Sequence, residues 1–256
     1  MSPSLIKSKE QIALMRQAGQ IVGSLLYDLE KMVQSGICPS ELDRYAREIT
    51  KQRGGQPAFL GYDGFPATLC ISVNDAVVHG IPDARPFLPG DVVGIDAGAI
   101  VDGWYADAAL TVLIPPAPRH GEHLLQATQR ALEAGIDRVH AGYHLGDVQA
   151  AIEQVIHEAG LGIVRDLTGH GIGQNLHEEP QIPNYGRPGS GPILRAGMTI
   201  CLEPMTTVGD PTVYLDRDGW TIRTRDGSLG AQFEHTILVT DGEPEILTAI
   251  RPWPSA

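Results

Sequence analysis

The sequence predicts an α+β protein built from two similar halves. Its 256 residues run in the order helices, strands, helices, strands, and no Pro/Ser-rich linker separates the two parts. A short motif also recurs. Asp96 follows Gly90 by six residues in GDVVGID, and Glu203 follows Gly197 by six in GMTICLE. Both acids end a short apolar strand, which favours two related halves within one compact body.

The first half begins with two helices. Ser8 and Gln11 have the spacing of a capping box, and apolar residues then recur at roughly helical period, which predicts a helix over residues 9–32. A second helix is expected to start near Pro39, because proline suits the first helical position. It is expected to stop at Gly54-Gly55.

The sequence after the second helix is rich in β-branched residues, interrupted by Gly and Asp residues that favour turns. The segments 68–82 and 90–114 read as hairpins. Helical patterns return at 121–140 and 146–159. Further strands are expected at 162–166, 197–204 and 231–240, with a turn-rich meander over 209–230.

Composition excludes several classes of protein. The net charge is −12, which argues against bulk electrostatic binding to nucleic acid or an anionic membrane. The three scattered cysteines form neither a disulfide framework nor a CxxC metal motif, and they fit a reducing compartment. The first residues have no apolar core of a signal peptide, and no apolar run is long enough to span a membrane. We therefore expect a cytoplasmic protein.

Acidic residues within apolar strands are the main indication of a functional site. Asp96 and Glu203 each end an apolar run, Glu234 precedes TILV, and Asp107 precedes the strand AALTVLI. Any one of them could be a strand-end acid facing water. An unpaired buried carboxylate is costly, however, and few Lys or Arg residues lie nearby in the sequence. Two divalent cations would balance four carboxylates, and His170 in a Gly-rich turn would complete an oxygen-dominated site.

Competing motifs fail on inspection. GHGIGQNL is not a GxGxxG dinucleotide motif, and HEEPQ is not HExxH, because Gln181 stands where the second histidine is needed. The sequence contains no GxSxG elbow and no P-loop. A basic and aromatic stripe for RNA binding is also absent.

Taken together, six strings resemble the type I methionine aminopeptidases, which have the pita-bread fold. They are SVNDAVVHGIP, DGWYAD, GHGIG, HEEP, CLEPM and QFEHTILVT, in the family's order and with similar spacing from about residue 8 to residue 249. The resemblance implies two pseudo-symmetric halves that share an antiparallel sheet with helices on its outer face. It further implies one catalytic metallopeptidase domain over residues 1–256.

The resemblance also assigns roles. The matched metal ligands are Asp96, Asp107, His170, Glu203 and Glu234. The matched catalytic residues are His79, His177 and Glu203. The substrate pocket is matched by Phe59, Tyr62, Phe65, Cys70, Leu176 and Trp220, together with His79 and His177. Near these positions the family commonly has a hydroxyl residue where this chain has Ala108, and Phe where it has Leu176.

The implied reaction is removal of the N-terminal methionine from nascent proteins whose second residue is small. Two divalent ions, with Co, Mn, Fe(II), Zn and Ni as candidates, would activate a water to hydroxide for attack on the first carbonyl. Glu203 would accept the proton, His177 would stabilise the oxyanion, and His79 would hold the second residue's amide. The implied partners are nascent N-termini, with transient ribosome contact, no membrane, no stable nucleic acid and a monomeric state.

Three other readings stay open at this point, and one is a divergent copy specialised for an unusual peptide or for resistance to an inhibitor. A proline-type aminopeptidase shares the fold and ligands, although such enzymes usually carry a further N-terminal domain. A metal-free pita-bread binding module would recognise a protein or RNA partner, although such modules typically lose ligands. Metal content of the purified protein would separate the binding module from the enzyme.

Overall fold

Four α-helices form in two pairs in the part of the chain described by the computed structural model, residues 5–254. They are α1 (Lys9–Met32), α2 (Pro39–Gln52), α3 (Gly121–Ile136) and α4 (Leu145–Glu158). The predicted capping box is present at Ser8. The Ser8 hydroxyl accepts from the Gln11 backbone amide, and the Ser8 backbone amide donates to the Gln11 side chain. Three predicted helices match within one or two residues. The third ends at Ile136 rather than residue 140.

The central sheet has nine strands, and its recorded pairings are all antiparallel. Its main path is β1-β4-β5-β14-β9-β7-β8, with β2 paired to β4 and β15 to β14. The bounds are β1 Gln56–Pro57, β2 Leu69–Val73, β4 Val92–Val101, β5 Trp104–Leu113, β7 Thr168–Gly171, β8 Glu178–Pro183, β9 Thr199–Leu202, β14 Glu234–Leu238 and β15 Glu245–Ile246. Asp102 and Gly103 join β4 to β5 with positive φ at both residues, the Asp-Gly hairpin that the sequence indicates.

Two smaller sheets complete the fold. One has the order β13-β10-β6 and the other β11-β12-β3. The bounds are β3 Ala76–Val78, β6 Gly162–Ile163, β10 Met205–Thr207, β11 Val213–Leu215, β12 Ile222–Thr224 and β13 Gly230–Gln232, and a short 3-10 helix, η1, spans Tyr62–Gly64.

Asp96 does not end a strand and Asp107 does not precede one, because they lie within β4 and β5. Three other local expectations are also wrong. Residues 68–82 do not form a hairpin ladder, because β2 pairs with β4 whereas β3 pairs with β12. The segment 231–240 is not one strand, since it divides at Phe233 into β13 and β14 in different sheets. His170 lies within β7 rather than in a turn. In each case long-range pairing decides the outcome, and local sequence cannot report it.

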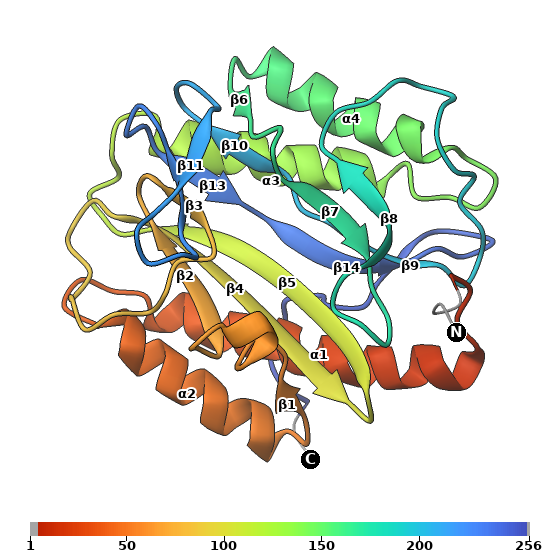
Figure 1. Cartoon of the computed structure of the whole chain (residues 1–256), viewed down its shortest axis with the longest axis horizontal. Helices are drawn as coiled ribbons and strands as arrows, with labels where there is room; N and C mark the ends of the chain where they lie inside the picture. The colour runs from red at the N-terminus through yellow and green to blue at the C-terminus, as the bar shows by residue number, and fades with distance from the viewer. Residues whose placement is uncertain (1–4, 255–256) are drawn as a thin grey trace.

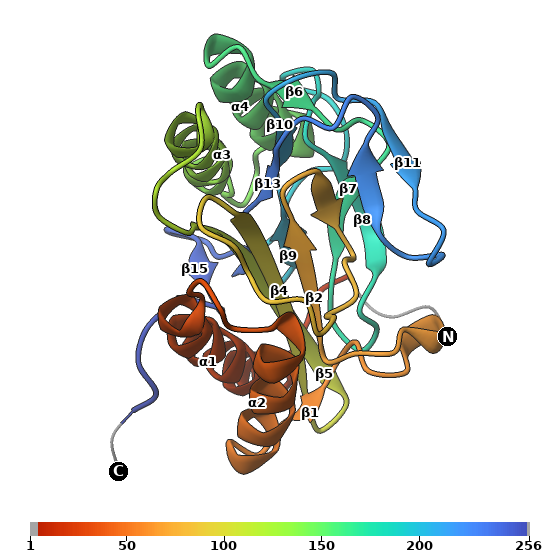
Figure 2. The same cartoon turned by 90° about the vertical axis from the view of Figure 1, so that its left-hand side faces the viewer.

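Both helix pairs lie on the same face of the sheet (Figures 1 and 2). One core cluster joins α1 and α2 to β2, β4 and β5, and a second joins α3 and α4 to β9 and β14. The two predicted halves with helices on the outer face are therefore confirmed. None of the described helices is apolar over a stretch long enough to cross a bilayer.

Close packing also ties the end of the chain to the first helix. A Cβ at Gly19 of α1 would lie 2.3 Å from the carbonyl oxygen of Leu247, well inside contact distance. Glycine at this position lets the backbone after β15 lie directly against α1. The sheet is thus backed by helices along its outer face, and its inner face is left to form the site.

Candidate metal centre and active site

The inner face of the sheet carries a cavity of about 270 Å³. Side chains alternate along β5, so Ala106 and Ala108 pack into the helix-side core while Asp107 between them points the other way. Ala108, which lacks the hydroxyl common at this position in the family, therefore faces the core rather than the cavity. Every site residue expected from the sequence lines this cavity: Phe59, Tyr62, Phe65, Cys70, His79, Asp96, Asp107, His170, Leu176, His177, Glu203, Trp220 and Glu234.

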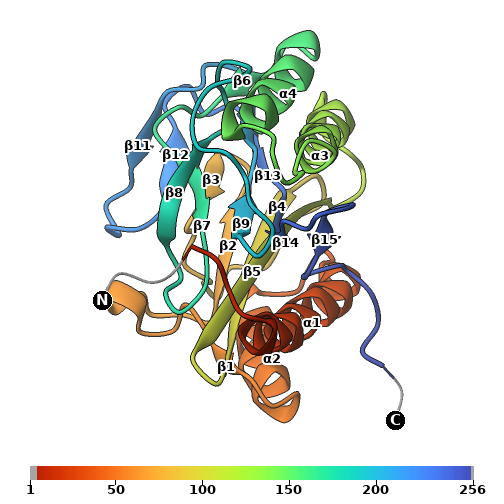
Figure 3. The ribbon, with the colours of Figure 1, turned by 90° about the vertical axis from the view of Figure 1, so that its right-hand side faces the viewer.

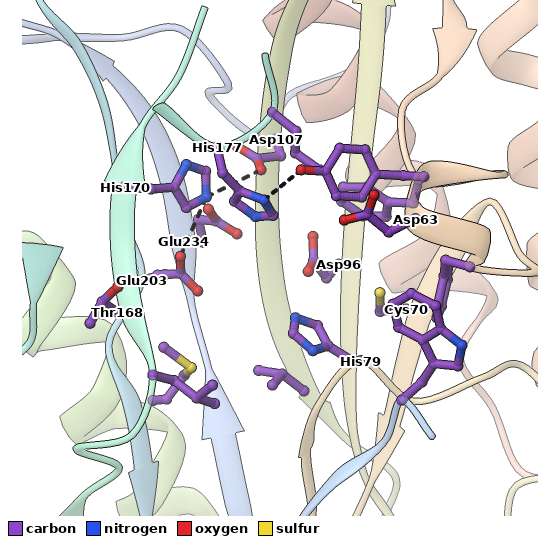
Figure 4. Close-up of a pocket in the computed structure, with 18 residues that line it drawn as sticks. Asp63, Cys70, His79, Asp96, Asp107, Thr168, His170, His177, Glu203 and Glu234 are labelled. Atoms are coloured by element: carbon purple, nitrogen blue, oxygen red, sulfur yellow. Dashed lines mark hydrogen bonds and ion pairs between the residues drawn. The ribbon is translucent and has the colours of Figure 1, made fainter. Parts of the chain in front are cut away.

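Strand register brings the acidic residues together. Asp96 on β4 and Glu234 on β14 are both paired with Ala109 on β5, one from each side, and Asp107 lies two residues earlier on the same face. Glu203 follows the end of β9, beside β14. Residues more than a hundred positions apart thus converge because they share one face of adjacent strands (Figure 4).

His170 presents a free ring nitrogen to this cluster. Its Nδ1 lies 2.9 Å from the Gly171 carbonyl oxygen, which can only accept, so Nδ1 carries the proton. In the neutral ring Nε2 then holds a lone pair, and it lies 3.7 Å from Asp107 Oδ2 and 3.5 Å from Glu203 Oε1. A lone pair facing two carboxylates is repulsive unless a cation lies between them. This is the arrangement of a metal-ligating histidine held by a backbone acceptor.

Two of the four carboxylates have a buried oxygen without the partner that a buried charge requires. Asp96 Oδ1 and Glu234 Oε1 are buried without a hydrogen-bond partner. Burial raises the pKa of Asp96 well above its usual value, and Asp107 raises it further. The pKa values of Glu203 and Glu234 are raised in the same way, by burial first and then by the neighbouring carboxylates. The donor set therefore fits divalent cations, which would satisfy these oxygens and offset the repulsion.

We predict that metal stabilises the protein more at pH 8 than at pH 5. In the unfolded chain these carboxyls titrate near pH 4, whereas in the metal-free fold their pKa values are raised. As pH rises through that window the unfolded chain releases protons that the fold retains, so metal-free stability falls. Cation binding removes this penalty. Metal at a hundredfold excess over Kd should contribute about 2.7 kcal/mol, or roughly 5–10 °C in Tm.

The measurement is thermal unfolding of chelator-treated and Mn²⁺-loaded protein across this pH range. Asp96→Asn should raise the metal-free Tm at pH 8 and reduce the gain from Mn²⁺. An equal gain at pH 5 and pH 8, or an unchanged gain in the variant, would contradict the prediction.

Asp107 is supported by two groups that sequence reasoning did not single out. Thr236 Oγ1 lies 2.8 Å from the Asp107 carbonyl oxygen and 3.2 Å from Oδ1. Burial raises the pKa of Cys201, so its thiol stays protonated and donates to Asp107 Oδ1 at 2.8 Å. Ligand atoms of Asp107, His170, Cys201 and Glu234 all lie within 4.8 Å of one another. Strand alternation from Glu203 to Cys201 would have placed this sulfur on the same face.

Gln232 is another residue of the site that sequence reasoning did not identify. Its Nε2 donates to Glu203 Oε2 at 3.1 Å, while Asn184 donates to the Glu203 backbone carbonyl at 3.0 Å. Glu203 is therefore fixed by its side chain and its backbone. Its other oxygen, Oε1, is the one that faces His170.

The cavity has an apolar part, and two further histidines adjoin it. Phe65 and Trp220 meet edge to face at 5.2 Å, beside Phe59 and Cys70 in one apolar cluster. His177 is held by the Tyr62 hydroxyl, 3.0 Å from Nδ1, and its ring meets His170 edge-on at 4.5 Å.

The two additional histidines have pKa values below the usual value, which favours the neutral ring. Loss of hydration in the cavity lowers the pKa of His79, and proximity to His177 lowers it further. The pKa of His177 is lowered first by lost hydration and then by His170. Neutral rings can donate a hydrogen bond without adding positive charge to the site.

Comparison with known proteins agrees with this geometry. The model of metallopeptidase family M24 matches residues 13–241. Methionine aminopeptidase of Clostridium acetobutylicum is 42% identical over 245 residues, covering 95% of this chain and 98% of the relative. The crystal structure of methionine aminopeptidase from Thermotoga maritima superposes with a TM-score of 0.94 at 42% identity, covering 97% of this chain and 99% of that one.

A prolidase from Pyrococcus furiosus shares the fold alone, at 22% identity and a TM-score of 0.76, and 65% of its chain is covered. By its family match and its full-length relatives, this chain belongs to metallopeptidase family M24, among the methionine aminopeptidases.

Proposed function

We propose that this chain removes the N-terminal methionine from proteins whose second residue is small, and that residues 1–256 act as one catalytic domain. The proposal rests mainly on one observation: a single cavity is lined both by a cluster of carboxylates and imidazoles and by apolar and aromatic side chains. The relatives that match over nearly the whole chain bear the name of this activity.

Two divalent ions would be held by Asp96, Asp107, His170, Glu203 and Glu234. When bound, such ions lower the pKa of water and polarise a carbonyl. The orphaned oxygens of Asp96 and Glu234 and the bare Nε2 of His170 support this ligand set. Oxygen-rich ligation with one imidazole suits Mn, Fe(II), Co, Ni or Zn, with cellular availability deciding among them.

The chain's own groups then act on the peptide. Glu203 Oε1 accepts a proton from the attacking water, since Gln232 holds the other oxygen in place. His177, oriented by Tyr62, donates to the oxygen that becomes negative on the first carbonyl. His79 holds the amide of the second residue and helps the amine to leave.

The pocket selects methionine. Phe59, Tyr62, Phe65, Cys70, Leu176 and Trp220 line its apolar part. Sulfur packs favourably against aromatic rings, and an unbranched thioether suits the apolar part of the cavity that Phe65 and Trp220 line. His79 and His177 at the other end bind the peptide backbone, so the side chain and the scissile bond are positioned together.

The proposed setting is the cytoplasm, with nascent N-termini as substrates. The three cysteines are free thiols, as a reducing compartment favours. The net charge of −12 fits only a transient contact with the ribosome. We further propose that the chain is a monomer.

The test is methionine release from Met-Ala-Ser and Met-Lys-Ser by metal-stripped protein with each divalent ion added back. We expect metal-dependent release from the first peptide and at least about tenfold less from the second, because a long second side chain meets the cavity wall. An Ala-Pro dipeptide serves as the control for a proline-type activity. Cleavage of Ala-Pro in preference, or no release with any metal from folded protein, would overturn the proposal.

A further inference from the structure

An ion pair outside the metal cluster joins the first described segment to the start of β8. Lys7 Nζ lies 2.8 Å from Glu178 Oε2, and the side chains are 3% and 4% exposed. Among the Lys and Arg ion pairs of the described residues this is the most buried. Figures 1 and 3 show the segment before α1, in red, reaching the strands of the second half. The Lys7 amide also donates to the Gly197 carbonyl at 2.8 Å.

Glu178 uses its second oxygen to close the turn before it. Its Oε1 accepts from the Asn175 amide at 3.1 Å. A Cβ at Gly173 would lie 2.6 Å from Lys7 Cε and 2.8 Å from the Glu178 carboxylate oxygens. The turn over residues 173–178 is therefore packed around the ion pair with no room for a side chain at Gly173.

This turn presents two cavity residues. Leu176 and His177 lie between the Asn175 amide and the Glu178 carboxylate that accepts from it. On the far side, β8 begins at Glu178 and pairs with β7, where the register shifts beside His170. A displacement of Glu178 would move His177, while His170 stays paired with Gln181 further along β8.

We propose that Lys7 is a positioning residue of the active site, which through its buried ion pair with Glu178 fixes the turn that presents Leu176 and His177. Lys7 itself does not line the cavity and acts only through Glu178. A buried carboxylate that loses its ammonium partner seeks water or protonates, and the turn shifts with it. A misplacement of about 1 Å is enough to lower turnover by about 10²-fold. The inference rests on the proposed function for its kinetic part.

The experiment compares Lys7→Met with Lys9→Met, which removes the same charge two residues away from an exposed position. The Lys7→Met variant should lower kcat/KM on Met-Ala-Ser by about 10²-fold, with raised KM and wild-type metal content. Lys9→Met should match wild type. A fall in kcat alone, in proportion to the folded fraction, would show a merely structural role and reject the proposal.

The double variant Lys7→Met/Glu178→Met covers the case in which the single variant does not fold. An apolar pair of similar volume restores packing but gives the Asn175 amide no acceptor. We expect a Tm near wild type with kcat/KM still at least about tenfold low. Recovery of kcat/KM together with Tm would overturn the proposal.

Histidine side-chain NMR gives a readout that does not depend on methionine release. The His177 ring signals should move in both Lys7 variants and stay in place in Lys9→Met, and unmoved signals would count against the positioning role. Inactive wild-type protein would instead reject the proposed function and leave this readout intact.

Discussion

Replacing Glu203 by Gln is expected to lower kcat/KM on Met-Ala-Ser by about 10⁴-fold or more. The change removes the proton acceptor for the attacking water and weakens a candidate metal ligand at the same time. Gln232 Nε2, now donating to Glu203 Oε2 at 3.1 Å, could still accommodate an amide oxygen, so the fold should survive. Because burial and neighbouring carboxylates raise the pKa of Glu203, loss of its charge should also stabilise the metal-free protein.

The measurement is steady-state kinetics at saturating metal with metal content determined in parallel. Glu243→Gln, which removes a carboxylate from an exposed position, is the matched control and should retain wild-type kinetics. Activity of Glu203→Gln within about tenfold of wild type would remove Glu203 from the mechanism.

Replacing His79 by Ala is expected to lower kcat by about 10²–10³-fold while metal content stays at the wild-type level. His79 lines the cavity but does not belong to the cluster of Asp107, His170, Cys201 and Glu234, so we expect that it is not needed to hold the ions. Lost hydration lowers its pKa, which favours the neutral ring, and a neutral ring can donate to the peptide in the transition state.

Two comparisons sharpen this test. His79 has a φ of 57°, a left-handed conformation that Asn tolerates better than most residues, so His79→Asn keeps the backbone with a shorter side chain. If the Ala and Asn variants lose kcat to the same extent, the loss comes from the missing imidazole ring and not from a change in the backbone at residue 79. Unchanged kcat in His79→Ala, or metal loss equal to the loss of activity, would reject a catalytic role.

Much of the local structure can be predicted from the sequence because its causes are local. The Ser8 capping box starts α1, and the Asp102-Gly103 turn fixes the β4–β5 hairpin. The recurrence of Gly90 with Asp96 and of Gly197 with Glu203 indicated two related halves with a shared acidic site. Of the two acids expected at strand ends, only Glu203 follows the end of its strand, whereas Asp96 lies within β4. The residues of that site were identified by resemblance, and the fold places them all around one cavity.

Other features depend on contacts between distant segments. Nothing in residues 68–82 shows that β2 and β3 join different sheets, since each finds its partner elsewhere in the chain. The Cys201 thiol beside Asp107 and the Gln232 amide beside Glu203 depend on strand register across β5, β14 and β9. A shift of one residue would send these side chains to the opposite face.

The sequence by itself determined the helices and the central hairpin, because spacing and residue type are local properties, and its resemblance to a known family supplied the predicted set of chemically active residues. Only the tertiary structure decided the tautomer of His170, the orphaned oxygens of Asp96 and Glu234, and the buried pair of Lys7 with Glu178. Those features arise from burial and from contacts between segments that lie as many as 171 positions apart. Such contacts are fixed by the packing of the whole chain and leave no pattern in any short stretch of it.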